Sequence, residues 1–207
     1  MKKSERKSIA KKRRAEILEA FHRCIMKYGL HKASNRKLAE EAGIQLSSLH
    51  HYFGNRNRIV EELIKHLIEE DIDRGKALGN QYGSSKERFD NMIRYLFDPS
   101  VLLGRHGGIF YDFWSEAFRN EKIRGTFRME IESIREVITT HIRDSGIAPG
   151  ISRVEIKELA NVLIALHEGT EYLWNMDPEN VSPKNSANLA KRFIEAYAKE
   201  RGKRKKA

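Results

Sequence analysis

Residues 167–171 read His-Glu-Gly-Thr-Glu and come nearest in this chain to a catalytic metal motif. The zinc motif His-Glu-x-x-His places two imidazoles one helical turn apart, with a general-base carboxylate beside the first. Here Glu171 stands where the second imidazole is needed, so these residues alone do not build a zinc site. His167 and Glu171 share a helix face and could hold a metal only with a third ligand from elsewhere. A pair in the core or facing solvent is the simpler interpretation.

The other arrangements that perform catalysis are missing from the sequence. Cys24 is the single cysteine, has no obvious base partner, and is expected to be a small core residue in a reducing compartment. His50 and His51 are adjacent and diverge by about 100° on a helix, which is poor geometry for one metal. There is no Gly-x-Ser-x-Gly nucleophile motif and no phosphate-cradling glycine loop. We therefore expect a protein that is not an enzyme and that carries no cofactor or metal.

The positive charge is concentrated in the N-terminal quarter of the chain. Residues 1–60 carry about +10, residues 61–198 about −5 and residues 199–207 about +5, giving the formal net charge of +10. Clustered lysine and arginine raise affinity for phosphates by releasing counterions. The distribution indicates that the N-terminal end binds a polyanion, although solubility and loose tails would give the same charge. Residues 1–14 are consistent with either solvated disorder or an arm that reaches DNA.

No segment of the sequence is suited to a membrane or to export. No apolar run approaches the ~20 residues of a membrane span. The basic residues 1–14 lack the apolar core and cleavage site of a secretory signal. We expect a cytoplasmic protein without membrane contact.

Apolar residues recur at helical spacing almost everywhere, and no alternating strand pattern is present. The pattern predicts an all-α chain of about nine helices, with a small N-terminal head of three helices and a larger antiparallel bundle. We place an N-terminal arm and helix-turn-helix in 1–54, a connecting helix in 55–80, a ligand-binding and dimerisation bundle in 81–201, and a basic tail in 202–207.

Residues 34–56 are predicted to form two short helices separated by a tight turn. Gly43 ends one short helix, since glycine adopts the left-handed conformation at little cost, and a second short helix follows over about 46–52. Such a helix-turn-helix lays its second helix in the DNA major groove. Leu49 and Phe53 would then return to the core, which leaves Gln45, Leu46, Ser47, Ser48 and His50 on the outer side. Serine side chains are short enough for close approach to base edges, and a histidine can donate to phosphate.

Residues 42–56, AGIQLSSLHHYFGNR, resemble the signature of TetR-type bacterial regulators over a match of roughly residues 9–68. The turn, the aromatic anchor and the following basic residue all fall in register. Gln45 stands where the family usually has serine, so the second helix has a poorer cap. The resemblance implies three groups of DNA contacts: Ser34 and Arg36 to phosphates; Gln45, Leu46, Ser47 and Ser48 to bases; His50, His51 and Arg56 to the backbone.

Residues 105–200 weakly resemble the ligand-binding half of TetR-type proteins, particularly the BetI-like choline/betaine group. The similarity lies in FYDFWSEAFRNEKIR (110–124) and LANVLIALHEGTEYLWNMDPE (159–179). Most aromatic residues at helical spacing belong to a core, but a subset could line a pocket where a buried carboxylate suits a cationic ligand. An exposed or interface-bonded glutamate is an equal alternative. The candidate ligand-binding residues are Phe110, Tyr111, Trp114, Phe118, His167, Glu168, Glu171 and Tyr172.

The last two expected helices carry apolar stripes that belong either to the core or to a partner. We expect them to form a homodimer, which would place two recognition helices about one DNA turn apart on a near-palindromic site. The expected dimerisation residues are Leu159, Leu163, Leu166, Leu189, Phe193 and Tyr197.

These expectations combine into a one-component transcriptional regulator, a repressor if it follows the family, that a small effector releases from DNA. Its partners would be double-stranded DNA, a second copy and a small molecule of unknown identity. The alternative is a ligand-independent DNA-binding or nucleoid-associated protein whose bundle only dimerises or docks a protein.

Overall fold

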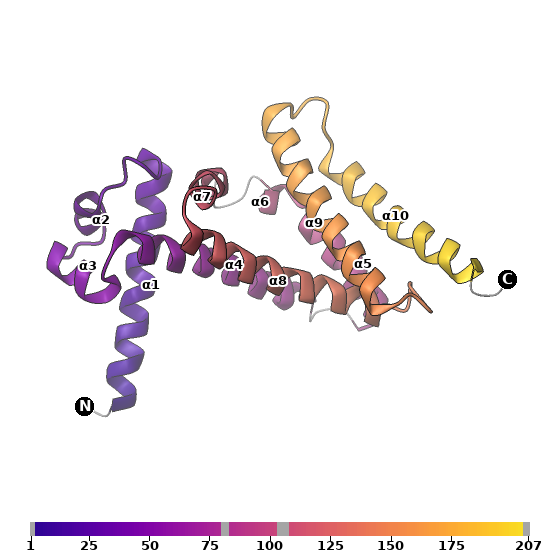
Figure 1. The fold of residues 1–207 in the computed structure, drawn as a ribbon, viewed down its shortest axis with the longest axis horizontal. Helices are drawn as coiled ribbons and strands as arrows, with labels where there is room; N and C mark the ends of the chain where they lie inside the picture. Colours follow the sequence, from indigo (N-terminus) through magenta and orange to yellow (C-terminus); the bar gives the residue numbers. More distant parts are fainter. Residues whose placement is uncertain (1–2, 80–82, 103–107, 205–207) are drawn as a thin grey trace. The chain divides into compact units, whose positions relative to one another are not determined.

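The computed structural model describes residues 3–79, 83–102 and 108–204, and within them the chain forms ten helices and no strand (Figure 1). The all-α prediction is confirmed. The helices are α1 (Lys3–Tyr28), α2 (Asn35–Glu41), α3 (Leu46–Phe53), α4 (Arg56–Gly79), α5 (Ser85–Leu96), α6 (Pro99–Leu102), α7 (Ile109–Ala117), α8 (Glu121–Asp144), α9 (Arg153–Met176) and α10 (Pro183–Arg204).

The helix that the sequence analysis did not predict is the single turn α6. Asp98 starts it, because its carbonyl oxygen accepts hydrogen bonds from the N–H groups of Val101 and Leu102. The Asp98 carboxylate also accepts the N–H of Ser100 at 2.8 Å. Pro99 occupies the first helical position, where its fixed φ is favourable and its missing N–H costs nothing.

Internal contacts divide the chain into two compact units. The first unit contains the described parts of residues 1–70 and 106–130, and we call this unit the head. The second unit contains the described parts of residues 71–105 and 131–207. This grouping differs from the boundaries expected at 54/55 and 80/81. Most of α4, all of α7 and the start of α8 belong with the head, because Ile59, Leu63, Phe113 and Ile123 are buried there.

The head contains the expected helix-turn-helix, in which α2 packs against both α1 and α3. Gly43 has φ of 61° and makes the turn between α2 and α3. Leu49 and Phe53 of α3 are buried, as the sequence pattern predicts. Gln45 makes no capping hydrogen bond with its side chain, which confirms the poorer cap. Cys24 is fully buried and burial raises the pKa of its thiol, in agreement with a core role.

The second unit has one apolar core shared by α5, α8, α9 and α10. Its helices start at strong caps. Ser84 and Glu87 form a capping box at α5, and Ser152 and Glu155 form another at α9, so two backbone donors are satisfied at each start. α10 packs beside both α9 and α5.

The two basic ends of the chain are more helical than expected. α1 begins at Lys3, so the described part of residues 1–14 is a helical extension of α1 and not solvated disorder. α10 continues to Arg204, beyond the expected end at residue 201. None of the described helices combines the length and apolarity of a membrane span.

Candidate nucleic-acid interface and effector region

The outer face of α3 presents short polar side chains, while the opposite face of the helix is apolar and buried. Gln45, Leu46 and Ser47 are exposed and Ser48 is partly exposed, while Leu49 is 1% exposed. Leu46, an apolar residue, is 43% exposed. An apolar side chain on a polar, groove-sized helix can contact a thymine methyl group, and the two serines can bond base edges. Base contacts by these residues stay a prediction.

Ser34 and Arg36 lie at the start of α2, the helix that packs against α3. The Ser34 hydroxyl accepts the N–H of Lys37 at 3.3 Å and so caps the helix. The Arg36 side chain is 86% exposed and pairs with Glu40 at 3.2 Å across one exposed turn. Exposed pairs of this kind contribute little free energy, so Arg36 can exchange Glu40 for a phosphate at small cost.

His50 and His51 lie at the end of α3, and both are exposed. The carbonyl of Gly54 lies 3.1 Å from Nδ1 of His50. Since a carbonyl only accepts, Nδ1 must donate, and this leaves Nε2 pointing away from the bond. His51 packs its ring edge-on against Tyr52. Phosphate contacts by the two histidines stay a prediction.

Arg56 corrects one expectation, because its guanidinium group is engaged inside the head. It donates to the carbonyl oxygens of Ala33, at 2.6 Å, and of Leu30. It also lies over the ring of Phe21, 5.5 Å from the centroid. Burial lowers the pKa of this group. Arg56 therefore clamps the α1–α2 connection and is not positioned to grip a phosphate.

Arg14 connects three helices of the head, a role that its place in the basic N-terminal end did not predict. Its guanidinium donates to the Tyr52 carbonyl at the end of α3 and forms a bidentate pair with Glu62 of α4. It also stacks on Phe53, 4.6 Å from the ring centroid. A usable signal was present: Arg14 falls three and four residues before the buried Ile17 and Leu18, on the same helix face.

The aromatic candidates on α7 belong to the first unit. Phe110 packs edge-on against Phe113 and Phe127, and Tyr111 against Trp114 at 5.3 Å between centroids. Phe118 follows the last residue of α7 and is 83% exposed, so its place in a ligand pocket stays a prediction.

Asp112 connects α7 to the helix-turn-helix. Its carboxylate accepts the backbone N–H of Leu30 at 3.2 Å. The carbonyl of the same residue receives Arg56. The residue at the α1–α2 connection is therefore held by α7 through its N–H and by α4 through its carbonyl group.

The candidates on α9 belong to the second unit. His167 Nδ1 donates to the Leu96 carbonyl at 2.7 Å, and burial lowers the pKa of its imidazole. Burial, with a smaller contribution from the Glu171 charge, raises the pKa of Glu168 to about 8. Donor atoms of His167, Glu168 and Glu171 all lie within 4.8 Å of one another. Tyr172 differs from them, since it is 51% exposed.

The predicted effector residues are thus divided between the units, with the α7 group in one and the α9 group in the other. A pocket common to both groups stays a prediction.

The expected dimer residues separate into buried and exposed sets. Leu159 and Leu163 are 4% and 1% exposed and belong to the core of the second unit, which corrects their assignment to a partner surface. Tyr197 packs partly against the same core. Leu166, Leu189 and Phe193 remain exposed, at 41%, 62% and 47%. They belong to a wider exposed apolar face of α9 and α10, which also includes Val154, Val162, Leu173 and Met176.

Two family descriptions match this chain. Residues 17–63 match "Bacterial regulatory proteins, tetR family", and residues 85–199 match "BetI-type transcriptional repressor, C-terminal". Among characterised relatives, the transcriptional regulator BetI of Rhizobium meliloti is 23% identical over 92% of this chain and 91% of its own. The regulator PksA of Bacillus subtilis is 24% identical over 91% of both chains.

Solved structures of transcriptional regulators share the fold of this chain. A transcriptional regulator assigned in Pseudomonas aeruginosa PAO1 has a TM-score of 0.80 and 18% identity, with 94% of each chain covered. A Saccharomonospora viridis regulator in complex with choline has a TM-score of 0.70 and 24% identity over 88% of this chain and 95% of its own.

The two family matches and the names of the relatives define a DNA-binding transcriptional regulator and not an enzyme. More narrowly, the chain belongs to the TetR family, with a C-terminal domain of the BetI type.

Proposed function

We propose that the protein is a dimeric repressor that binds a near-palindromic operator and leaves it when a small cationic effector binds. The outer face of α3 carries the DNA-binding part of this proposal. Gln45, Leu46 and Ser47 are exposed there on a helix whose Leu49 and Phe53 are buried. Ser48 joins them as a base contact, and Ser34, Arg36, His50 and His51 supply phosphate contacts around them.

The exposed face of α9 and α10 supports the dimer. Val162, Leu166, Leu173 and Met176 recur at helical spacing on α9, and a Cβ atom at Gly169, which lies among them, would meet nothing within 4 Å. A stripe of this length is too apolar to remain in water without a partner. A two-fold pair of copies joined here would present two α3 helices to successive major grooves.

A cationic effector is supported by the Glu168 site. A carboxyl whose pKa is raised to about 8 is mostly protonated at neutral pH, so it costs less to bury than a charge would. A cation beside it would favour the ionised form and displace the proton. The choline complex of the Saccharomonospora viridis regulator makes choline the first probe to try.

The Asp112 contact supports a route for release within the head. Any effector that moves α7 would pull on the Leu30 peptide, and Arg56 holds the carbonyl of that residue. Release then needs only that the effector binds the displaced arrangement better than the DNA-bound one.

The deciding experiment is selection from a random duplex library at two salt concentrations, with wild type, Ser47→Ala and Arg36→Ala side by side. We expect a near-palindromic site to be enriched. Ser47→Ala should change the preferred bases, while Arg36→Ala should weaken all sequences alike and lower the salt dependence of binding by about one ion.

Binding without enrichment would replace the proposal by the ligand-independent nucleoid-associated alternative. Absence of binding at both salt concentrations would remove α3 as a DNA contact.

A further inference from the structure

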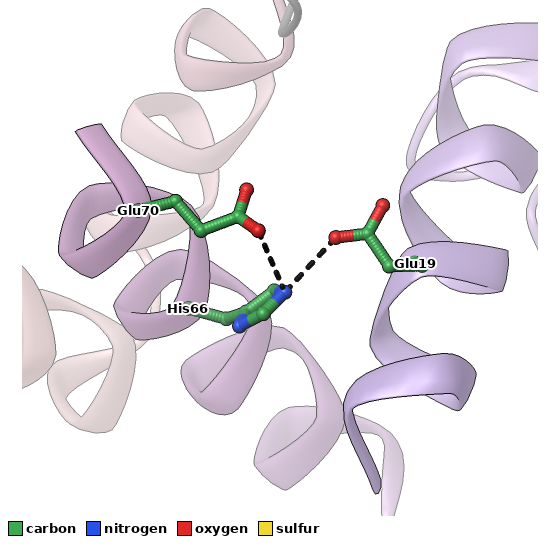
Figure 2. A group of neighbouring side chains, drawn as sticks. All are labelled: Glu19, His66 and Glu70. Carbon is green, nitrogen blue, oxygen red and sulfur yellow. Dashed lines mark hydrogen bonds and ion pairs between the residues drawn. The ribbon is translucent and has the colours of Figure 1, made fainter. Parts of the chain in front are cut away.

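A second group of ionisable side chains lies inside the head, away from the outer face of α3. Glu19 projects from α1, and His66 and Glu70 project from successive turns of α4 (Figure 2). Oε1 of Glu19 lies 3.0 Å from Nε2 of His66, and Oε1 of Glu70 lies 3.7 Å from the same nitrogen. All three donor atoms lie within 4.8 Å of one another.

Both carboxylates approach a single nitrogen atom, and this is hard to explain by hydrogen bonding alone. One N–H points in one direction, and the contact with Glu70 at 3.7 Å is too long for a hydrogen bond. The head core nearby does not require these charges, since α1 and α4 already bury Ile17, Phe21, Leu63 and Leu67.

The spacing fits ligands arranged around a metal ion. Tetrahedral ligands at zinc bond lengths lie about 3.3 Å from one another. The two measured distances, 3.0 and 3.7 Å, bracket that value. The side chains of Glu19, His66 and Glu70 are 35%, 22% and 30% exposed, so water can complete the coordination and an ion can enter.

We propose that Glu19, His66 and Glu70 bind one divalent transition-metal ion of the zinc class. One imidazole and two carboxylates suit an ion of intermediate softness better than magnesium or calcium, which prefer oxygen ligands alone. The ion joins α1 to α4 and so stabilises the head, because the unfolded chain does not hold the three ligands together. The site is independent of the proposed effector.

The test is a titration of the protein with cobalt(II), whose visible absorption reports tetrahedral coordination. Zinc is then added to displace the cobalt. We expect saturable binding of one ion and a rise of the unfolding temperature with zinc. His66→Gln and Glu19→Gln should each weaken cobalt binding by more than roughly tenfold. Glu16→Gln is the matched control, because Glu16 lies one turn away on α1, is 44% exposed and pairs with Arg13.

Circular dichroism without metal shows whether each variant folds. If His66→Gln does not fold, the metal binding of Glu19→Gln tests the proposal. No saturable binding up to about 1 mM ion would overturn the proposal and leave a plain ion pair. Undiminished binding in both variants would also overturn it. His167→Gln identifies the competing position, because α9 gathers the other described group of one imidazole and two carboxylates.

Discussion

At the scale of single residues, two arginines of the head have roles that differ from those their positions suggest. Arg56 opens the helix after α3, where a cation would favour a phosphate, yet it bonds two carbonyl groups of its own chain. Arg14 lies in the most basic stretch of the sequence, yet it pairs with Glu62 and caps the end of α3. Net charge therefore overstates how many cations are free for DNA.

Replacing Arg56 by alanine should destabilise the head more than it changes DNA chemistry. Two carbonyl groups would lose a charged donor, and we expect a loss of about 2 kcal/mol in the free energy of unfolding measured with urea. Arg58→Ala is the control, because Arg58 is exposed and its side chain pairs with Glu61 and Glu62 on its own helix α4. A variant as stable as wild type but with a weaker salt dependence of DNA binding would restore the phosphate role.

Glu168 should make the stability of the second unit depend on pH. Its pKa is raised from 4.5 to about 8, so between these values the folded chain keeps a proton that the unfolded chain loses. Stability should therefore fall as pH rises through this window, by at most about 1.4 kcal/mol per pH unit. Urea unfolding of wild type and Glu168→Gln from pH 5 to pH 9 measures this. Parallel curves for the two proteins would assign the dependence to another group.

At the scale of the elements, the apolar stripes of α9 and α10 serve two purposes that sequence periodicity does not separate. Leu159 and Leu163 face the core, while Leu166, one turn beyond Leu163, is exposed. A helix packed on one side and unpartnered on the other shows apolar residues around most of its circumference. The helices themselves could be predicted, but the side that remains open depends on where α5 and α8 pack.

A charge on the open side should separate the dimer. Phe193→Glu would bury a carboxylate against the partner's apolar face, and we expect the dissociation constant to rise by a hundredfold or more, on the order of 3 kcal/mol. Sedimentation at several concentrations measures it. Met129→Glu is the control, since Met129 is 70% exposed on α8 and lies outside this face. An unchanged mass for Phe193→Glu would exclude this face as the interface.

At the scale of the whole molecule, local sequence signals predicted the helices, the turn at Gly43 and the polar face of α3. Each depends on residues close together in the chain. The α7 contact with Leu30, the Arg14 clamp and the Glu19–His66–Glu70 group connect positions tens of residues apart, and one sequence offers no periodicity that pairs them. The grouping of α7 with the head was missed for the same reason.

The contact between Asp112 and Leu30 should be needed for release of the operator by the effector, but not for the affinity of the protein for DNA. Asp112→Ala removes the acceptor for the Leu30 N–H, so operator binding should persist while choline, or whichever effector is identified, releases the operator several-fold less. Asp112→Asn keeps an oxygen acceptor and should restore the response. Fluorescence anisotropy of a labelled operator measures both. Equal release in the alanine variant would exclude this route.

The two arginine clamps have a consequence for how such a protein can diverge. Arg14 and Arg56 bond the carbonyl oxygens of Leu30, Ala33 and Tyr52, which every amino acid at those positions would supply. The exposed residues of α3 make none of these bonds. Descendants of this gene can therefore change the residues that read DNA, and acquire new target sites, while the support that positions α3 is inherited unchanged.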